Sequence, residues 1–299
     1  MKKAFTLIEL IIVITIIGIL GSMGADIFMR MFTGYYESKV QNELQNKTDL
    51  AIDQIANRLT YRIKSSVIVH TGGNNFTPIE SAAGSQGTLE WVGYDNDSLR
   101  GRSIDNTLAS NYLIPGWSGF IDLDSSTATT LVTPGGNTTY AVDFIGSLSY
   151  GDVNFSTNAV GNNVVIIFPD APGIADDFGW YGSTPSYVHP VFALGDNQLR
   201  RTVADFSGAA NEVYENYMLA FSAYALELDN GNLFLYYNYQ PWNNERYDAN
   251  TTNRSLLLED VSTLQFIQVG NILKLQLCVN SPEVFGDQNY SFCKEKAIF

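Results

Sequence analysis

The sequence contains few of the residues that build catalytic or metal centres. Of its 299 residues two are cysteine, Cys278 and Cys293, and two are histidine, His70 and His189. A zinc site takes three or four His and Cys ligands close in space, and these four residues are too widely spread to predict one. The chain also lacks the motifs G-x-S-x-G, H-E-x-x-H, G-x-G-x-x-G and the Walker phosphate loop. We therefore expect no catalysis, no cofactor and no bound metal ion.

Basic residues are scarce as well. The chain has 17 Lys and Arg against 31 Asp and Glu, which gives a net charge of -14. Such a surface repels the phosphate backbone of nucleic acids. We expect no nucleic-acid partner. A local basic patch at Arg200-Arg201 remains the alternative.

The most informative segment is an apolar stretch over residues 5–25, in which Glu9 is the only charge. About 20 apolar residues suffice to cross a bilayer as a helix, whereas a secretory signal peptide has a shorter core of roughly 7 to 15. Lys2 and Lys3 precede the stretch, and Asp26 is the first charge beyond it. The positive-inside rule predicts a cytoplasmic N-terminus and an exported remainder.

Glu9 is energetically unusual in this setting. On translocon scales a central acidic residue costs about 2.5 to 3.5 kcal/mol, and such residues usually find a partner. The stretch offers no second charge, so the partner must come from outside it: a headgroup, water, or another copy's N-terminus. From these residues alone, a carboxylate that snorkels to the membrane surface is the simpler explanation.

The segment Lys2-Lys3-Ala4 followed by Phe5-Thr6-Leu7-Ile8-Glu9 resembles the class III leader and first mature residues of type IV pilins and type II secretion pseudopilins. The resemblance implies that a prepilin peptidase cuts between Ala4 and Phe5 and methylates the Phe5 amine. It also implies that Glu9 pairs with the N-terminal amine of a neighbouring subunit during assembly. Ala4 departs from the family, which usually has glycine there. The implied partners are the peptidase, other pilin or pseudopilin subunits and the inner-membrane assembly platform.

An amphipathic helix is predicted beyond the membrane segment. Residues 27–66 contain no proline, and Gly34 is their only glycine. Apolar residues at spacings of three and four define one face, which we expect to pack on the protein's own globular domain: Val40, Leu44, Ala51 or Ile52, Ile55, Leu59 and Ile63. The opposite face is expected to carry the polar residues Lys39, Glu43, Lys47, Asp53 and Arg58. Four glycines either loosen the helix or let neighbouring helices approach closely: Gly18, Gly21, Gly24 and Gly34.

The chain after about Thr77 has the pattern of β structure with long polar loops. Short β-prone runs bounded by Gly, Pro, Asn and Asp predict strands at 88–94, 140–145, 164–168, 191–194 and 219–228. Turns at Asn230-Gly231 and Gly270-Asn271 predict two hairpins, the second joining 264–269 to 272–279. We expect residues 217–279 to form an antiparallel sheet against the amphipathic helix, an α+β, pilin-like fold. Segments 103–136 and 173–187 are expected to be surface loops.

The predicted organisation has five parts. They are a leader (1–4), a transmembrane helix (5–25), an amphipathic extension (26–66), a linker (67–79) and an exported β-rich domain (80–299). In an oxidising periplasm we expect Cys278 and Cys293 to form a disulfide that stabilises the fold by about 3 kcal/mol. Two free thiols are the alternative.

Two surface features have open interpretations. Asp95-Asn96-Asp97 and Asp122-Leu123-Asp124 offer oxygen ligands for calcium, but neither has the EF-hand spacing, and solvated acidic turns are commoner. The aromatic stretch 234–242 suits a sugar-stacking or adhesive surface, although alternating aromatics more often pack across a sheet.

Within the family, the long helix, sheet and late hairpin are most similar to the J-type minor pseudopilin and the W-type minor pilin. Glu9 argues against the K-type tip pseudopilin, which usually lacks that acid. The resemblance implies a minor subunit that helps to initiate or cap a type IV pilus or type II secretion pseudopilus. It would be anchored in the inner membrane with its C-terminal domain periplasmic, and later lie in a filament or at the cell surface. A filament-tip adhesin and a membrane-anchored periplasmic enzyme are the alternatives.

Overall fold

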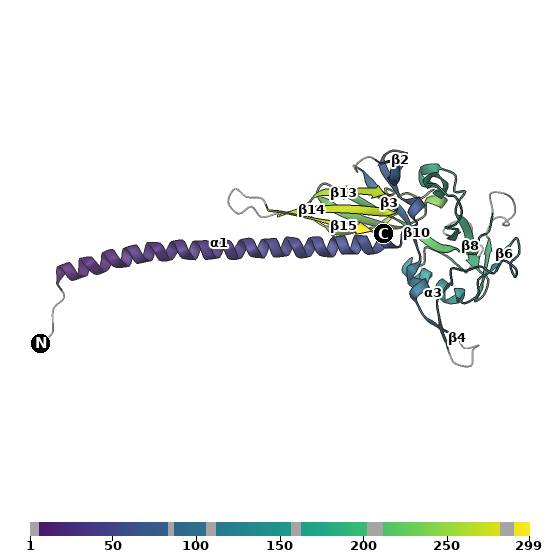
Figure 1. Ribbon diagram of the computed structural model, residues 1–299, viewed down its shortest axis with the longest axis horizontal. Coiled ribbons are helices and arrows are strands. Elements are labelled where there is room, and N and C mark those ends of the chain that lie inside the picture. Colours follow the sequence, from purple (N-terminus) through teal and green to yellow (C-terminus); the bar gives the residue numbers. More distant parts are fainter. Residues whose placement is uncertain (1–5, 83–86, 106–111, 157–162, 202–211, 282–289) are drawn as a thin grey trace.

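A single long helix and a β-rich domain make up the protein (Figure 1). The computed structural model describes residues 6–82, 87–105, 112–156, 163–201, 212–281 and 290–299. The helix, α1 (Leu7–Thr60), has 54 residues and is therefore about 80 Å long. A small sheet lies along its C-terminal half, and a larger sheet lies around and beyond its C-terminal end.

α1 is one continuous helix through all four of its glycines, so the expected loosening is absent. It ends at Thr60, before the expected end near residue 66, and a short 3-10 turn, η1 (Lys64–Ser66), follows. The helix ends there because the backbone groups of the next residues form hydrogen bonds with residues 92–94 of a strand. The Ile63 N–H donates to the Val92 carbonyl at 2.9 Å, and the Tyr94 N–H donates to the Tyr61 carbonyl at 2.9 Å.

The apolar face predicted for α1 is the buried one. Its side chains form a core with both sheets, and burying each Val, Leu or Ile is worth about 1.5 to 3 kcal/mol. This face consists of Val40, Leu44, Ala51, Ile52, Ile55, Ala56 and Leu59. Thr48 is buried among them, and its hydroxyl donates to the Leu44 carbonyl at 2.7 Å, which satisfies it within the helix.

The small sheet packs on this face of α1. It has the antiparallel order β13 (Val261–Val269), β14 (Ile272–Asn280) and β15 (Ser291–Ile298). Val269 pairs with Ile272, which confirms the predicted hairpin at Gly270-Asn271. In β14 the leucines at 273, 275 and 277 are buried and Lys274 is exposed, as the alternation predicts.

The larger sheet is antiparallel throughout its described pairs. Its order is β2 (Asn75–Pro78), β1 (Ile68–Gly72), β3 (Thr88–Tyr94), β10 (Met218–Asp229), β7 (Val164–Ile167), β8 (His189–Ala193), β9 (Gln198–Arg201) and β6 (Thr130–Val132). β11 (Asn232–Tyr239) also pairs with β10, and β12 (Asn253–Leu258) pairs with β11. Asp229 pairs with Asn232, which confirms the predicted turn at Asn230-Gly231.

Three hydrophobic clusters stabilise these layers. The first lies between α1 and the sheets. The second lies where β1, β3, β10 and β11 meet the short 3-10 turns η3 (Ala175–Phe178), η4 (Trp180–Gly182) and η5 (Pro241–Asn243). The third joins β7, β8 and β9 to a helix, α3 (Thr138–Leu148). The domain therefore has one lobe built on α1 and another built away from it.

The strand predicted over 140–145 and the linker predicted over 67–79 are both wrong. Segment 140–145 was expected to be a strand but lies in α3, because Asn137 caps the helix by accepting from the Tyr140 N–H at 3.1 Å and Ala141 and Ile145 face the third cluster. The expected linker 67–79 contains β1 and β2, and its glycines make the turn between them, with Gly72 at φ 118° and Gly73 at φ 65°.

The other strands follow the sequence more closely. β3, β7, β8 and β10 fall on the predicted runs. The single sheet expected over 217–279 is divided, because β10 to β12 belong to the larger sheet and β13 and β14 to the smaller one. The segments expected to be loops hold β6, η3, η4 and a small sheet of β4 (Ser103–Asp105) and β5 (Tyr112–Ile114).

Candidate functional site

The N-terminal half of α1 has no packing partner within the described chain. Every residue from 7 to 32 is exposed, including the large apolar side chains Leu7, Ile17, Phe28 and Met31. Among the residues that the structure describes, α1 alone is long and apolar enough to cross a membrane, with a window of mean hydropathy 2.4. Such a surface is stable only against lipid or other protein.

The polar side chains of this half-helix are satisfied within the helix. The hydroxyls of Thr15, Ser22 and Thr33 donate to the carbonyls of Ile12, Ile19 and Met29, each at 2.9 Å. These bonds lower the cost of placing hydroxyls in a bilayer, where no water is present to pair with them. Up to Ala25 the helix therefore presents an almost uniformly apolar surface in which Glu9 is the only charge, and Asp26 and Arg30 follow it.

Glu9 lies in the first turn of α1, at the end nearest the expected cleavage site. Its Oε2 accepts from the Thr6 backbone N–H at 3.3 Å and from the Thr6 hydroxyl at 3.1 Å. A carboxylate at this position also interacts favourably with the positive end of the helix dipole. In the isolated chain Glu9 thus accepts only from neutral donors, and no described cation pairs with it. Ala4 and Phe5, the residues predicted for cleavage and methylation, lie outside the described residues.

A row of polar contacts joins the C-terminal half of α1 to β15. Lys294 Nζ lies 2.6 Å from Asp49 Oδ1, and Lys296 Nζ lies 2.6 Å from Asp53 Oδ1. The hydrogen bond from Lys296 lowers the pKa of Asp53. Asp53 was expected on the face of α1 away from the domain, and the structure turns it toward β15 instead.

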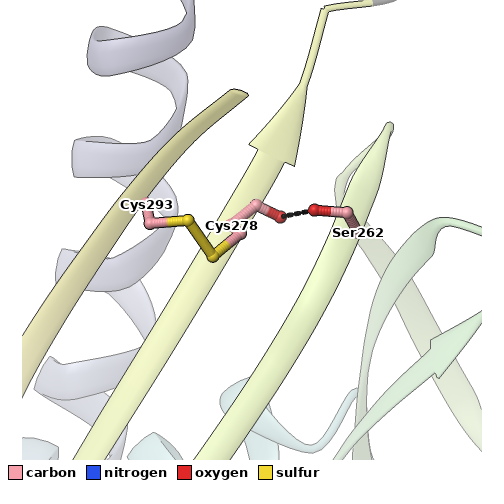
Figure 2. The surroundings of a disulfide bond; sticks show 3 residues. All are labelled: Ser262, Cys278 and Cys293. Carbon is pink, nitrogen blue, oxygen red and sulfur yellow. Dashed lines mark hydrogen bonds between the residues drawn. A yellow bond between two sulfur atoms is a disulfide. The ribbon is translucent and has the colours of Figure 1, made fainter. Parts of the chain in front are cut away.

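The two cysteines are bonded to each other across β14 and β15 (Figure 2). Cys278 and Cys293 are direct partners in the strand register, with their Cα atoms 4.0 Å apart. Ser262 of β13 donates to the Cys278 carbonyl at 3.3 Å, so all three strands are joined at this level. The disulfide fixes the strand that carries Lys294 and Lys296, and so supports the attachment of the sheet to α1.

The two acidic turns are used for local structure. Asp95 caps the short helix α2 (Asn96–Arg100) by accepting from the Ser98 N–H at 3.1 Å. Asp122 accepts from the backbone N–H of Asp124 at 3.1 Å and from the Ser125 hydroxyl at 2.7 Å. Over the described ranges, no group of three His, Cys, Asp or Glu residues is arranged to hold a metal ion.

A buried acid that the sequence did not single out lies in β3. Glu90 is 1% exposed, and its carboxylate accepts from the hydroxyls of Tyr181 and Tyr239, the latter at 2.8 Å. Burial raises the pKa of Glu90 to about 8. His70 stacks on the Tyr181 ring, with centroids 4.2 Å apart. Perturbed acids often mark active sites, but enclosure by these rings makes Glu90 part of the core.

The aromatic stretch 234–242 divides between core and surface. Tyr236, Tyr239 and Trp242 are buried in the second hydrophobic cluster, as expected for aromatics that pack across a sheet. Tyr237 is half-buried and lines a surface groove. This groove draws on distant segments of the chain, so no local spacing in the sequence could reveal it.

Comparison with known proteins identifies the N-terminal segment. Residues 1–25 match the family model described as the prokaryotic N-terminal methylation motif. The chain thus carries a prepilin-type N-methylation motif at its N-terminus and has a pilin-like architecture. The match covers the apolar start of the chain. The rest of the chain has a pilin-like architecture as well, since its long N-terminal helix packs on antiparallel sheets. No curated protein and no solved structure matches the chain.

Proposed function

We propose that this pilin-like protein is a minor subunit of a type IV pilus or type II secretion pseudopilus that helps to initiate or cap the filament. The observation that carries the proposal is the half-helix of residues 7–32, exposed over its whole length and preceded by the N-methylation motif. Helices of this kind bundle by van der Waals packing once they leave the lipid. Gly18, Gly21 and Gly24 have open space around them, which permits close approach of a neighbouring helix.

The expected sequence of events starts in the inner membrane. The N-terminus lies in the cytoplasm, where a prepilin peptidase cuts between Ala4 and Phe5 and methylates the new amine. The assembly platform then extracts the subunit into a filament. There Glu9 exchanges its contact with Thr6 for the amine of a neighbouring subunit. Opposite charges in a low-dielectric helix bundle attract strongly, so this pair fixes the subunit register better than apolar packing can.

The minor role is supported by the size of the domain. A major pilin is usually a shorter chain than these 299 residues, and filament subunits that occur in few copies tolerate a large domain more readily. The J-type minor pseudopilin and the W-type minor pilin are the subtypes we favour, on the long helix, the sheet along it and the late hairpin of β13 and β14.

Processing is tested by expressing the chain with its prepilin peptidase and determining the N-terminus of the product by mass spectrometry. We expect a mature chain that begins with N-methylated Phe5. Ala4→Gly should be processed at least as fast, since it restores the residue that the family usually has. Retention of Met1, or a cut after Gly24, would contradict the proposal that this chain is processed as a prepilin.

Assembly is tested with Glu9→Val. We expect this variant to be processed normally and inserted in the membrane, but to be at least tenfold depleted from sheared filaments in quantitative immunoblots. Glu43→Gln is the matched control, because Glu43 is an exposed α1 acid outside the membrane segment and forms an ion pair with Lys47. Normal incorporation of Glu9→Val would refute the pairing.

A further inference from the structure

A groove of about 640 Å³ opens beside the C-terminal end of α1. Its volume lies within the range of about 300 to 1,000 Å³ typical of small-molecule sites. The walls come from α1, the junction of β3 and α2, the turn after α3, and strands β10 to β12. Gln54 of the groove lies 22 helical residues beyond Phe32, which places it about 33 Å along α1 from the end of the exposed half. The site is thus remote from the membrane.

Tyrosine rings form much of the lining. Tyr61 and Tyr94 meet edge to face with centroids 5.6 Å apart. The Tyr224 ring lies across the backbone at Gly93, where a Cβ would be 2.7 Å from the ring, so the strand needs glycine to accept it. Tyr237 and Tyr150 complete the set. Tyrosine gives a groove flat apolar faces together with hydroxyls that form hydrogen bonds.

The lining also holds strained backbone. Tyr150 has a left-handed φ of 56° although it is 79% exposed, and Asn238 has a φ of 59°. A bulky residue rarely adopts this conformation, and such strain often accompanies binding sites. An exposed ring held in a strained turn at the rim of a groove has no packing role in the described chain that would account for it.

Two buried polar atoms in the lining make no hydrogen bond of standard geometry with a described residue. They are Oδ2 of Asp95, a residue only 3% exposed, and Nδ2 of Asn238. The other oxygen of Asp95 caps α2, and the backbone N–H of Asn238 donates to the Ser222 hydroxyl at 2.9 Å. Buried polar atoms are almost always paired, so an unpaired acceptor and an unpaired donor in one groove point to a ligand that supplies both kinds of group.

The charges of the lining disfavour anionic ligands. Arg58 is its one basic residue, against the acids Asp95 and Asp97, and the whole chain carries a net charge of -14. An anionic polymer would be repelled by this field. A neutral ligand with apolar faces and many hydroxyls fits tyrosine faces, amides and a carboxylate together, and this is the chemistry of a sugar.

We propose that this groove binds an uncharged glycan. Tyr150 and Tyr237 stack on sugar rings, while Asp95 Oδ2 accepts from one hydroxyl and Asn238 Nδ2 donates to another. A second, more polar cavity of about 470 Å³ shares Asn238 with the groove and is lined by Gln240, Asn244 and Thr252 among others. The shared residue makes the two cavities neighbours, so the ligand extends over more than one sugar unit. This binding is additional to the role in a filament and does not depend on it.

The test uses the full chain in phosphocholine micelles, because maltoside detergents are themselves glycosides. Chitohexaose, cellohexaose and maltohexaose are titrated by calorimetry, with hexagalacturonate as the charged comparison. We expect at least one neutral hexasaccharide to bind. For that sugar, Tyr150→Ala and Asp95→Asn should each weaken affinity at least tenfold. Tyr150 is exposed, and Asn at 95 still caps α2, so both variants should fold.

Tyr35→Ala is the matched control, since Tyr35 is a 69% exposed tyrosine on α1 outside the groove, and its affinity should equal that of the wild type. Lack of binding by all three neutral sugars, tighter binding of the galacturonate, or unchanged affinity in both groove variants would overturn the proposal. Incorporation into filaments is scored separately by immunoblot, so failure of glycan binding is distinguishable from failure of the filament role.

Discussion

Two glutamates lie where an acid is expensive, and the chain stabilises them by similar means. Glu9, in the apolar half of α1, accepts two hydrogen bonds from Thr6. Glu90, inside the domain, accepts from the hydroxyls of Tyr181 and Tyr239. Neither forms an ion pair with a described residue. The two acids differ in their surroundings. Glu9 is exposed and can exchange its hydrogen-bond partners, whereas Glu90 is enclosed, so the free-energy cost of burying it is part of the stability of the folded domain.

The enclosed acid gives a pH dependence whose sign can be derived. Burial raises the pKa of Glu90 from 4.5 to about 8. Between these values the folded chain holds a proton that the unfolded chain has lost, so stability falls as pH rises. Burial raises the pKa of Asp95 only to about 6, and it lowers the pKa of His70 and, to about 4, that of His189. These three groups change the stability mainly below about pH 6.5. Among the described residues, Glu90 therefore dominates the change in stability between about pH 6.5 and 8.

We expect the free energy of unfolding to fall by about 1 to 2 kcal/mol between pH 6.5 and 8, and Glu90→Gln to remove most of that fall. Glutamine resembles the protonated acid and can still bond both tyrosines. The measurement is urea unfolding followed by the fluorescence of the buried Trp91 and Trp180. Glu43→Gln should keep the wild-type slope, because the pKa of Glu43 is lowered by Lys47. Equal slopes in all three proteins would contradict the assignment.

At the level of elements, the sequence correctly predicts those helices and turns that depend on residues close together in the chain. The face of α1 follows from its spacing, and the turns at Asn230-Gly231 and Gly270-Asn271 follow from turn chemistry. β15 was not predicted, because alternating lysines and a glutamate in 291–298 give no strand signal. Its partners are distant: Asp49 and Asp53 in α1 and Cys278 in β14. The groove beside α1 is unpredictable for the same reason, since its lining comes from six separate segments.

The dependence of β15 on distant partners can be measured by removing the disulfide. We expect Cys278→Ser with Cys293→Ser to lower the free energy of unfolding by about 3 kcal/mol, as for other loops of similar length. Amide exchange should rise most in β15, because its pairing with β14 and its ion pairs to α1 are then less constrained. Ser262→Ala, which removes one hydrogen bond at the same level, should cost only about 1 kcal/mol. Protection of β15 equal to that of the wild type would show that the disulfide is dispensable.

The whole molecule consists of two parts with opposite solvent preferences. Residues 7–32 expose an apolar rod, whereas α1 from Val40 onward is built into an acidic, water-facing domain. The boundary lies near Tyr36, which is partly buried against the first core cluster. Membrane attachment and folding of the domain should therefore be separable within one continuous helix.

Truncation at two points tests this separation. Deleting residues 1–34 removes no side chain that is buried over the described residues 6–34, so we expect a soluble monomer whose thermal midpoint matches that of the full chain within a few degrees. Deleting residues 1–46 also removes Val40 and Leu44 from the core, which should cost about 3 to 6 kcal/mol and lower the midpoint clearly. The measurements are membrane fractionation, light scattering and thermal unfolding. If the shorter deletion already destabilised the domain, the exposed half of α1 would have to pack on it, and that half would not be free to join a filament.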